Sequence, residues 1–105
     1  MRTLFDQSTP APLRQFLAGH DVATVYEHGW STLDNGELLA AVENAGFELF
    51  ITTDQNLRYQ QNLTGRRLSF LVLPTTRWPQ IERHIAEITA AVDSMRPGEY
   101  HELKW

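Results

Sequence analysis

Hydrophobic residues along the chain occur in short runs that predict strands alternating with helices. Four runs are nearly continuous in apolar or β-branched residues, as in strands of a parallel sheet that is covered on both faces. These strands are expected at residues 2–5, 22–26, 47–51 and 68–73, and a final edge strand is expected at residues 100–105.

Apolar residues spaced three or four apart predict helices between these strands. The helices are expected after Pro10 and Pro12, from Asp34 to Gly46, at residues 57–62 and from Pro79 to Met95. The last helix has the clearest pattern and is expected to bury Ile81, Ile85, Ile88 and Val92 against the sheet. Alternating strands and helices imply a single α/β domain over residues 1–105, a three-layer α/β/α sandwich around a mostly parallel sheet.

Polar residues begin abruptly where two of the strands are expected to end. Asp6 follows the first strand, and Thr52, Thr53 and Asp54 end the third. Open α/β sheets bind ligands at the carboxyl ends of their strands, so two central parallel strands would bring both carboxylates to one edge. The alternative is that each aspartate only caps the helix that follows it.

Composition narrows the classes of function. The net charge of −4 argues against binding nucleic acid through bulk electrostatics, because such binding needs many Lys and Arg contacts to phosphate. The absence of cysteine excludes disulfides, thiolate catalysis and zinc–thiolate sites, and it fits a reducing cytoplasm. No apolar run approaches the length of a membrane span. A cytoplasmic protein without a membrane partner is therefore expected.

Carboxylates at the predicted element boundaries are candidate metal ligands. They are Asp6, Asp54 and either Asp34 or Glu37. Clustered carboxylates repel one another unless a cation joins them, and hard oxygen ligands select Mg²⁺ or Mn²⁺. Such an ion supports phosphodiester hydrolysis. Asp34 and Glu37 also have the spacing of a reciprocal helix cap, and this alternative stays open.

Residues 4–17, 20–30 and 33–57 together resemble the small PIN-like domains, which are related to the VapC-type toxins of bacterial toxin–antitoxin pairs. The family places an aspartate after the first strand, an acid at the start of the central helix, and a Thr-x-Asp or Thr-Asp at the end of a later strand. The resemblance therefore implies metal ligands at Asp6, Asp34 and Asp54 and catalytic carboxylates at Asp6, Glu37 and Asp54.

The resemblance also implies a function, a metal-dependent endoribonuclease that uses Mg²⁺ or Mn²⁺ and is the toxin of a type II toxin–antitoxin pair. Its partners would be an RNA substrate and a cognate antitoxin protein. The residues expected to contact the substrate are Thr53, Asn56, Arg58 and Arg66. The sequence departs from the family at Gln7 and Asn56, where further acids are common.

Two other functions compete with the nuclease. Gln7 and Asn56 favour a degenerate PIN-like binding module without turnover. A receiver-type phosphoacceptor domain would also carry aspartates after its first and third strands. Gln7, and the absence of any lysine before Lys104, argue against the receiver.

A homodimer formed near His84 is a further expectation, because the apolar stripe of the last helix is wide.

Overall fold

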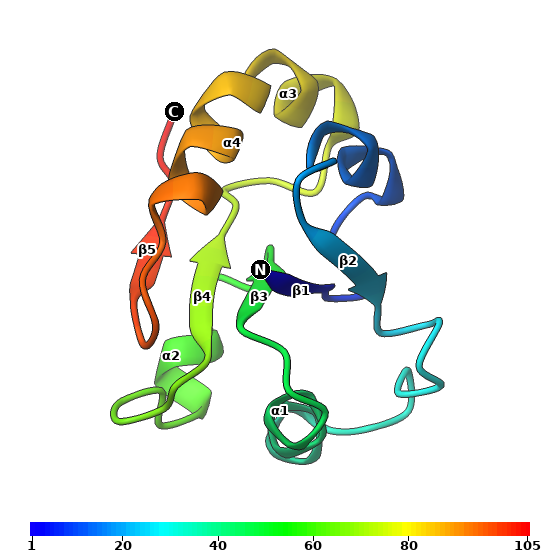
Figure 1. Cartoon of the computed structure of the whole chain (residues 1–105), viewed down its shortest axis with the longest axis vertical. Coiled ribbons are helices and arrows are strands. Elements are labelled where there is room, and N and C mark those ends of the chain that lie inside the picture. The colour runs from blue at the N-terminus through cyan, green and yellow to red at the C-terminus, as the bar shows by residue number, and fades with distance from the viewer.

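The computed structural model describes residues 1–105 and contains one parallel sheet between two layers of helices (Figure 1). The strands are β1 (Arg2–Phe5), β2 (Asp21–Thr24), β3 (Leu49–Thr52), β4 (Ser69–Val72) and β5 (Tyr100–Glu102). The helices are the 3-10 helix η1 (Ala11–Phe16) and the α-helices α1 (Asn35–Asn44), α2 (Leu57–Gln60), α3 (Trp78–Arg83) and α4 (Ile85–Ser94). The predicted α/β sandwich is confirmed, and its sheet is parallel throughout.

The strands lie in the order β2-β1-β3-β4-β5. The first strand is therefore central and pairs with β2 on one side and β3 on the other. In the β1–β3 pair, Phe5 lies opposite Ile51, so Asp6 and Thr52 follow at the same edge. The prediction that Asp6 and Asp54 come from adjacent central strands is confirmed.

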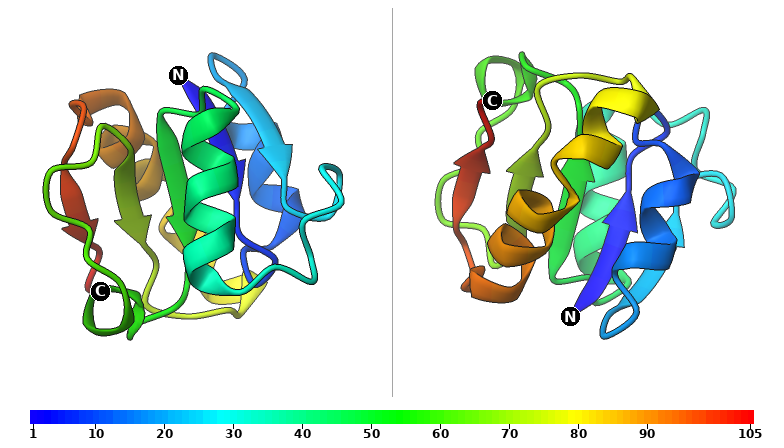
Figure 2. Two further views of the ribbon diagram at one scale, coloured as in Figure 1. Left: turned by 90° about the horizontal axis from the view of Figure 1, so that it is seen from below. Right: turned by 90° about the horizontal axis from the view of Figure 1, so that it is seen from above.

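Alternate residues of the buried strands supply two separate cores. On one face Phe5, Ile51 and Leu71 pack beneath η1, α3 and α4. On the other face Phe50 and Phe70 pack against α1 and α2. Figure 2 shows the two layers, with α1 in front in the left view and the η1, α3 and α4 layer in front in the right view.

Helix α1 begins at the predicted capping box. Asp34 Oδ1 accepts a hydrogen bond from the Glu37 N–H at 2.8 Å, and Glu37 Oε1 accepts one from the Asp34 N–H at 3.2 Å. The two side chains thus satisfy backbone donors that a helix start leaves unpaired. The sequence signal for this helix start was correct.

Two predicted helices differ from those observed. The segment after Pro10 is a 3-10 helix rather than an α-helix, and Phe16 is 39% exposed. The N–H groups of Leu13 and Leu17 bond to the carbonyl oxygens three residues earlier, at Pro10 and Arg14, which is the 3-10 pattern.

No helix in the structure combines the length and the apolar character that a membrane span needs.

The predicted helix from Pro79 to Met95 is broken at His84, which separates α3 from α4. His84 has φ −115° and ψ 22°, outside the α-helical region. Its ring stacks on Trp105 with centroids 4.3 Å apart, and its Nδ1 lies 2.7 Å from Glu87 Oε1. Ile81, Ile88 and Val92 are buried as expected, whereas Ile85 is half-buried.

The homodimer near His84 stays a prediction.

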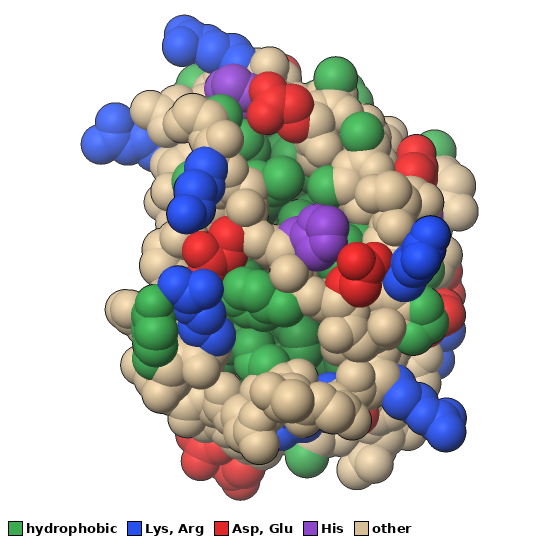
Figure 3. Space-filling view, turned by 90° about the vertical axis from the view of Figure 1, so that its left-hand side faces the viewer, with side chains coloured by type: hydrophobic (Ala, Val, Ile, Leu, Met, Phe, Trp, Pro, Cys, Tyr) green, Lys and Arg blue, Asp and Glu red, His purple; other side chains and the backbone are tan.

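Strand β5 forms one edge of the sheet, and a polar cluster fixes it to α2. The Tyr100 hydroxyl donates to Glu102 Oε1 at 2.6 Å, and Arg58 Nε lies 3.3 Å from the same oxygen. Burial, and then the bond to Glu102, raise the pKa of Tyr100. Figure 3 shows this side of the molecule, where hydrophobic side chains lie in hollows bordered by charged ones.

Candidate functional site

The candidate site lies where the connections of the sheet change direction. Strand β1 leads to β2 on one side, and the chain then returns across β1 to enter β3 on the other. Ligands of open α/β sheets bind at such a switch point, outside the carboxyl ends of the strands. Asp6 ends β1 at this point, and Thr52, Thr53 and Asp54 end β3.

Thr52 joins the two aspartates. Its hydroxyl donates to Asp6 Oδ2 at 2.7 Å and accepts from the Asp54 N–H at 3.0 Å. The other carboxylate oxygen of Asp6, Oδ1, accepts the Gln7 N–H at 2.8 Å. Because each oxygen has its own donor, the plane of the Asp6 carboxylate is fixed. Thr52 is completely buried, whereas Asp6 and Asp54 are half-buried and in reach of solvent.

Asp54 is held by the turn that leads into α2. Its Oδ1 accepts the Asn56 N–H at 2.9 Å, a local turn typical of aspartate. Asn56 itself stands before α2 but makes no side-chain capping bond. Gln55 donates to the carbonyl oxygens of Thr53 and Leu73, at 3.2 and 2.6 Å, so it ties this turn to the end of β4.

The other two acids of the expected site are used differently. Asp34 and Glu37 are exposed and bond to each other's backbone in the capping box. No group of three or more histidine, aspartate or glutamate side chains in the structure could hold a metal ion. Asp6 and Asp54 are thus brought to one edge without a third acid beside them.

The donors at this edge fit one kind of metal site. Mg²⁺ commonly binds proteins through one or two carboxylates and takes its remaining ligands from water and substrate phosphate. Each Asp6 oxygen has one donor and so keeps one lone pair free, and no donor is bonded to Asp54 Oδ2. The free carboxylate oxygens of Asp6 and Asp54 are therefore ligands of the kind that Mg²⁺ or Mn²⁺ takes in this open form of site.

A pocket of about 490 Å³ opens beside Asp6. Most of its lining residues are of polar type, and Asp6 is the only charged one. The remaining lining residues are Gln7, Ser8, Thr9, Pro10, Ala11, Thr24, Tyr26 and Thr76. They come from the loops after β1, β2 and β4, so the pocket extends along the carboxyl edge of the sheet.

The predicted phosphate contacts are separated by the fold. Arg58 lies in α2, after β3, but it pairs with Glu102 and donates to the Tyr59 hydroxyl. Arg66 lies in the turn before β4, at the amino ends of the strands, and pairs with Glu43. Arg77 follows pocket-lining Thr76 and makes no ion pair, which leaves its charge available at the carboxyl edge.

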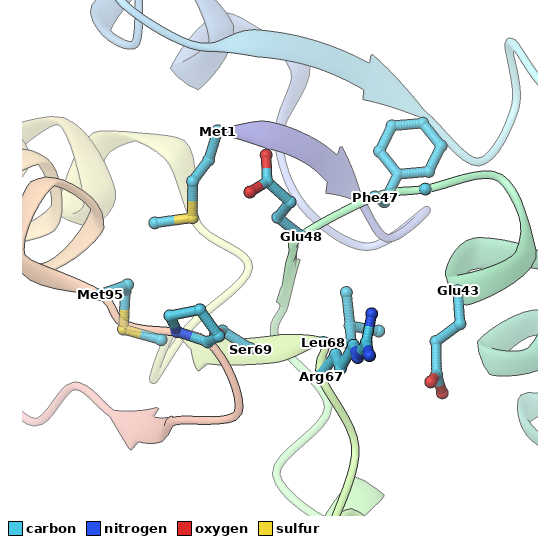
Figure 4. Close-up of a pocket in the computed structure, with 10 residues that line it drawn as sticks. Met1, Glu43, Phe47, Glu48, Arg67, Leu68, Ser69 and Met95 are labelled. Atoms are coloured by element: carbon cyan, nitrogen blue, oxygen red, sulfur yellow. The ribbon is translucent and has the colours of Figure 1, made fainter.

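A second pocket, of about 430 Å³, lies at the amino edge of the sheet (Figure 4). Met1 and Met95 line one side, and Glu43 from α1 lies on the other. Glu48 and Arg67 add opposite charges. The pocket is remote from Asp6 and Asp54, because these follow the opposite ends of the strands.

Several residues of the site were not predicted to have a role. Thr52 links the aspartates, Tyr26 lines the pocket, and Arg77 lies next to it. The sequence placed Tyr26 inside the strand expected at residues 22–26, but β2 ends at Thr24, so Tyr26 lies in the turn that follows. Comparison of the chain with protein-family models, curated protein sequences and solved structures finds no match.

Proposed function

We propose that the chain is a PIN-like, divalent-metal-dependent endoribonuclease that acts in the cytoplasm as the toxin of a toxin–antitoxin pair. The observation that supports it best is the position of Asp6 and Asp54 at the switch point of a parallel sheet, joined through Thr52. The RNA substrate and the antitoxin partner follow from the sequence resemblance.

The chain's own groups have distinct roles in this proposal. Asp6 and Asp54 would hold Mg²⁺ or Mn²⁺, which when bound polarises a phosphoryl oxygen and activates water. Thr52 and the Gln7 N–H orient the Asp6 carboxylate. Thr53 and Asn56 flank Asp54, where a phosphodiester would approach, and Arg77 offers a positive charge to phosphate. The pocket beside Asp6 offers room for part of the RNA.

A binding module without turnover is the second candidate. The absence of a three-acid group favours it, because two carboxylates compensate the charge and the dehydration cost of a divalent ion less well than three.

A receiver-type phosphoacceptor domain is the third candidate. The strand order also occurs in receiver domains, which favours this hypothesis. However, the place of a receiver's second acid after β1 is taken by Gln7.

Cleavage of a mixed single-stranded RNA tests the nuclease. Wild type should cut with Mn²⁺ or Mg²⁺ and not with EDTA. Asp6→Asn and Asp54→Asn should each lower the rate at least ~100-fold, since each removes a charge that holds the ion. Asp21→Asn is the matched control, because Asp21 lies at the amino end of β2 and should leave the rate unchanged.

The outcomes separate the candidates. Metal-dependent cleavage that requires Asp6 and Asp54 but not Asp21 supports the nuclease. RNA binding without metal-dependent cleavage favours the binding module. Stable phosphorylation of Asp54 by acetyl phosphate would support the receiver instead.

A further inference from the structure

Tyr26 is a large aromatic side chain that the fold leaves outside. Its side chain is 78% exposed and makes no hydrogen bond or aromatic contact within the chain. Burial in the core therefore does not account for it. It lines the pocket that also contains Asp6, so its ring borders the candidate catalytic site.

The backbone that carries Tyr26 is firmly held, although the ring is free. Val25, before it, is buried, and its N–H donates to the Phe5 carbonyl at 3.0 Å. On the other side, Glu27 Oε1 accepts the Thr24 N–H at 2.9 Å, and the Glu27 N–H donates to the Thr24 hydroxyl at 3.1 Å. Arg14 forms an ion pair with Glu27. The ring thus projects from a turn that is fixed on both sides.

The groups around Tyr26 suit the base and sugar of a nucleotide. The hydrogen bond from Arg14 lowers the pKa of Glu27, and the two side chains form an ion pair. The pocket walls offer hydroxyl groups from Ser8, Thr24 and Thr76. Hydroxyls suit the sugar and base edges of a nucleotide, and an exposed tyrosine ring suits base stacking.

We propose that this pocket is a nucleotide subsite in which Tyr26 stacks on one unpaired base of the RNA, next to the phosphate at Asp6. A base inside a duplex is stacked on its neighbours and cannot lie on Tyr26, so the subsite selects unpaired RNA. This inference rests on the proposed RNA substrate. It identifies Tyr26 as a specificity-determining residue.

A second tyrosine provides a matched control. Tyr59 is 72% exposed, nearly as much as Tyr26, but it does not line the pocket. The Arg58 guanidinium lies over its ring at 4.7 Å and also donates to its hydroxyl. One face of Tyr59 is therefore covered, whereas no group covers Tyr26.

The test is an NMR titration of the ¹⁵N-labelled protein in EDTA with adenosine, and separately with ribose, which has no base. Neither probe carries a phosphate that the Asp6 carboxylate would repel in the absence of metal. The expected result is shifts of the Ser8, Thr9, Thr24, Tyr26 and Thr76 amides with adenosine, and weaker binding of ribose. Tyr26→Ala should weaken adenosine binding about fivefold or more, and Tyr26→Phe should retain it. Tyr59→Ala should have no effect.

Equal binding of the two ligands, shifts that lie elsewhere, or an unchanged affinity in Tyr26→Ala would overturn the subsite. Because the titration contains no metal and needs no cleavage, its result is independent of the nuclease test. A protein that binds adenosine through Tyr26 but cuts no RNA refutes turnover alone. A protein that cuts RNA but shows none of these shifts refutes the subsite alone.

Discussion

Thr52 is a buried polar residue whose two hydrogen bonds both serve the candidate site. Its hydroxyl is the donor to Asp6 and the acceptor for the Asp54 N–H. A valine of the same shape would leave both groups without this partner. A buried donor left unpaired costs about 1–3 kcal/mol.

Thr52→Val should therefore lower the free energy of unfolding by ~1–3 kcal/mol, as measured by urea denaturation. It should also slow metal-dependent RNA cleavage, because the Asp6 carboxylate loses the bond that fixes its plane. Thr52→Ser keeps the hydroxyl and should recover most of the cleavage rate. If Thr52→Val matched wild type in both measurements, the hydroxyl would have no role at the site.

The sequence alone predicted which residues lie at the ends of strands, but it did not predict which of these residues contact one another. Asp6 and Asp54 were found because a polar residue follows each apolar run. The bond from Thr52 to Asp6 depends on the pairing of β1 with β3, which brings together residues 46 positions apart. No local pattern carries that information.

Helix α1 shows how an acid at the carboxyl edge can serve the fold alone. Asp34 and Glu37 form the capping box of this helix. Neither of them joins Asp6 and Asp54 in a group of three acids that could hold a metal ion. We therefore expect the cap to be the role of Asp34. The metal role implied by the resemblance is the competing prediction.

Asp34→Ala should lower the free energy of unfolding by ~0.5–2 kcal/mol, because a helix N–H loses its acceptor. Asp34→Asn should retain both the stability and the rate of RNA cleavage, since asparagine caps helices as well as aspartate does. Thermal melting and the cleavage assay measure the two effects. Loss of cleavage in Asp34→Asn at unchanged stability would instead identify a metal ligand.

Element types were largely predictable, and the exceptions have local causes. The apolar runs predicted strands β1 to β4, and the capping box predicted the start of α1. The break at His84 was not visible, because Ile81, Ile85 and Ile88 continue one helical spacing across it. The contact of His84 with Trp105, at the far end of the chain, accompanies the break.

The whole molecule is acidic, with a net charge of −4, yet the proposed substrate is a polyanion. Four basic side chains, Arg14, Arg58, Arg77 and Lys104, lie in the segments that follow strands at their carboxyl ends. Arg14 and Arg58 are ion-paired with Glu27 and Glu102, which leaves two of the four without an ion pair. Arg66 and Arg67 are at the opposite edge. RNA binding should therefore involve few phosphate contacts and depend weakly on salt.

With at most two phosphate contacts, the logarithm of the RNA affinity should fall against the logarithm of salt concentration with a slope of about −1.4 or shallower. Fluorescence anisotropy of a labelled single-stranded RNA with Asp6→Asn, which should bind without cutting, measures this slope. Arg77→Ala should make it shallower, whereas Arg67→Ala should not change it. A slope steeper than about −4 would point to a larger basic surface than this edge provides.

The central place of β1 has a consequence for how the protein is made. Residues 2–5 are synthesised before both of their partner strands, and the later of these partners ends only at Thr52. Parallel neighbours cannot be joined by a tight hairpin, so each pairing must wait for a long crossover segment to be synthesised. The middle of the sheet therefore stays incomplete until β3 has emerged, and assembly of such non-local pairs is intrinsically slow.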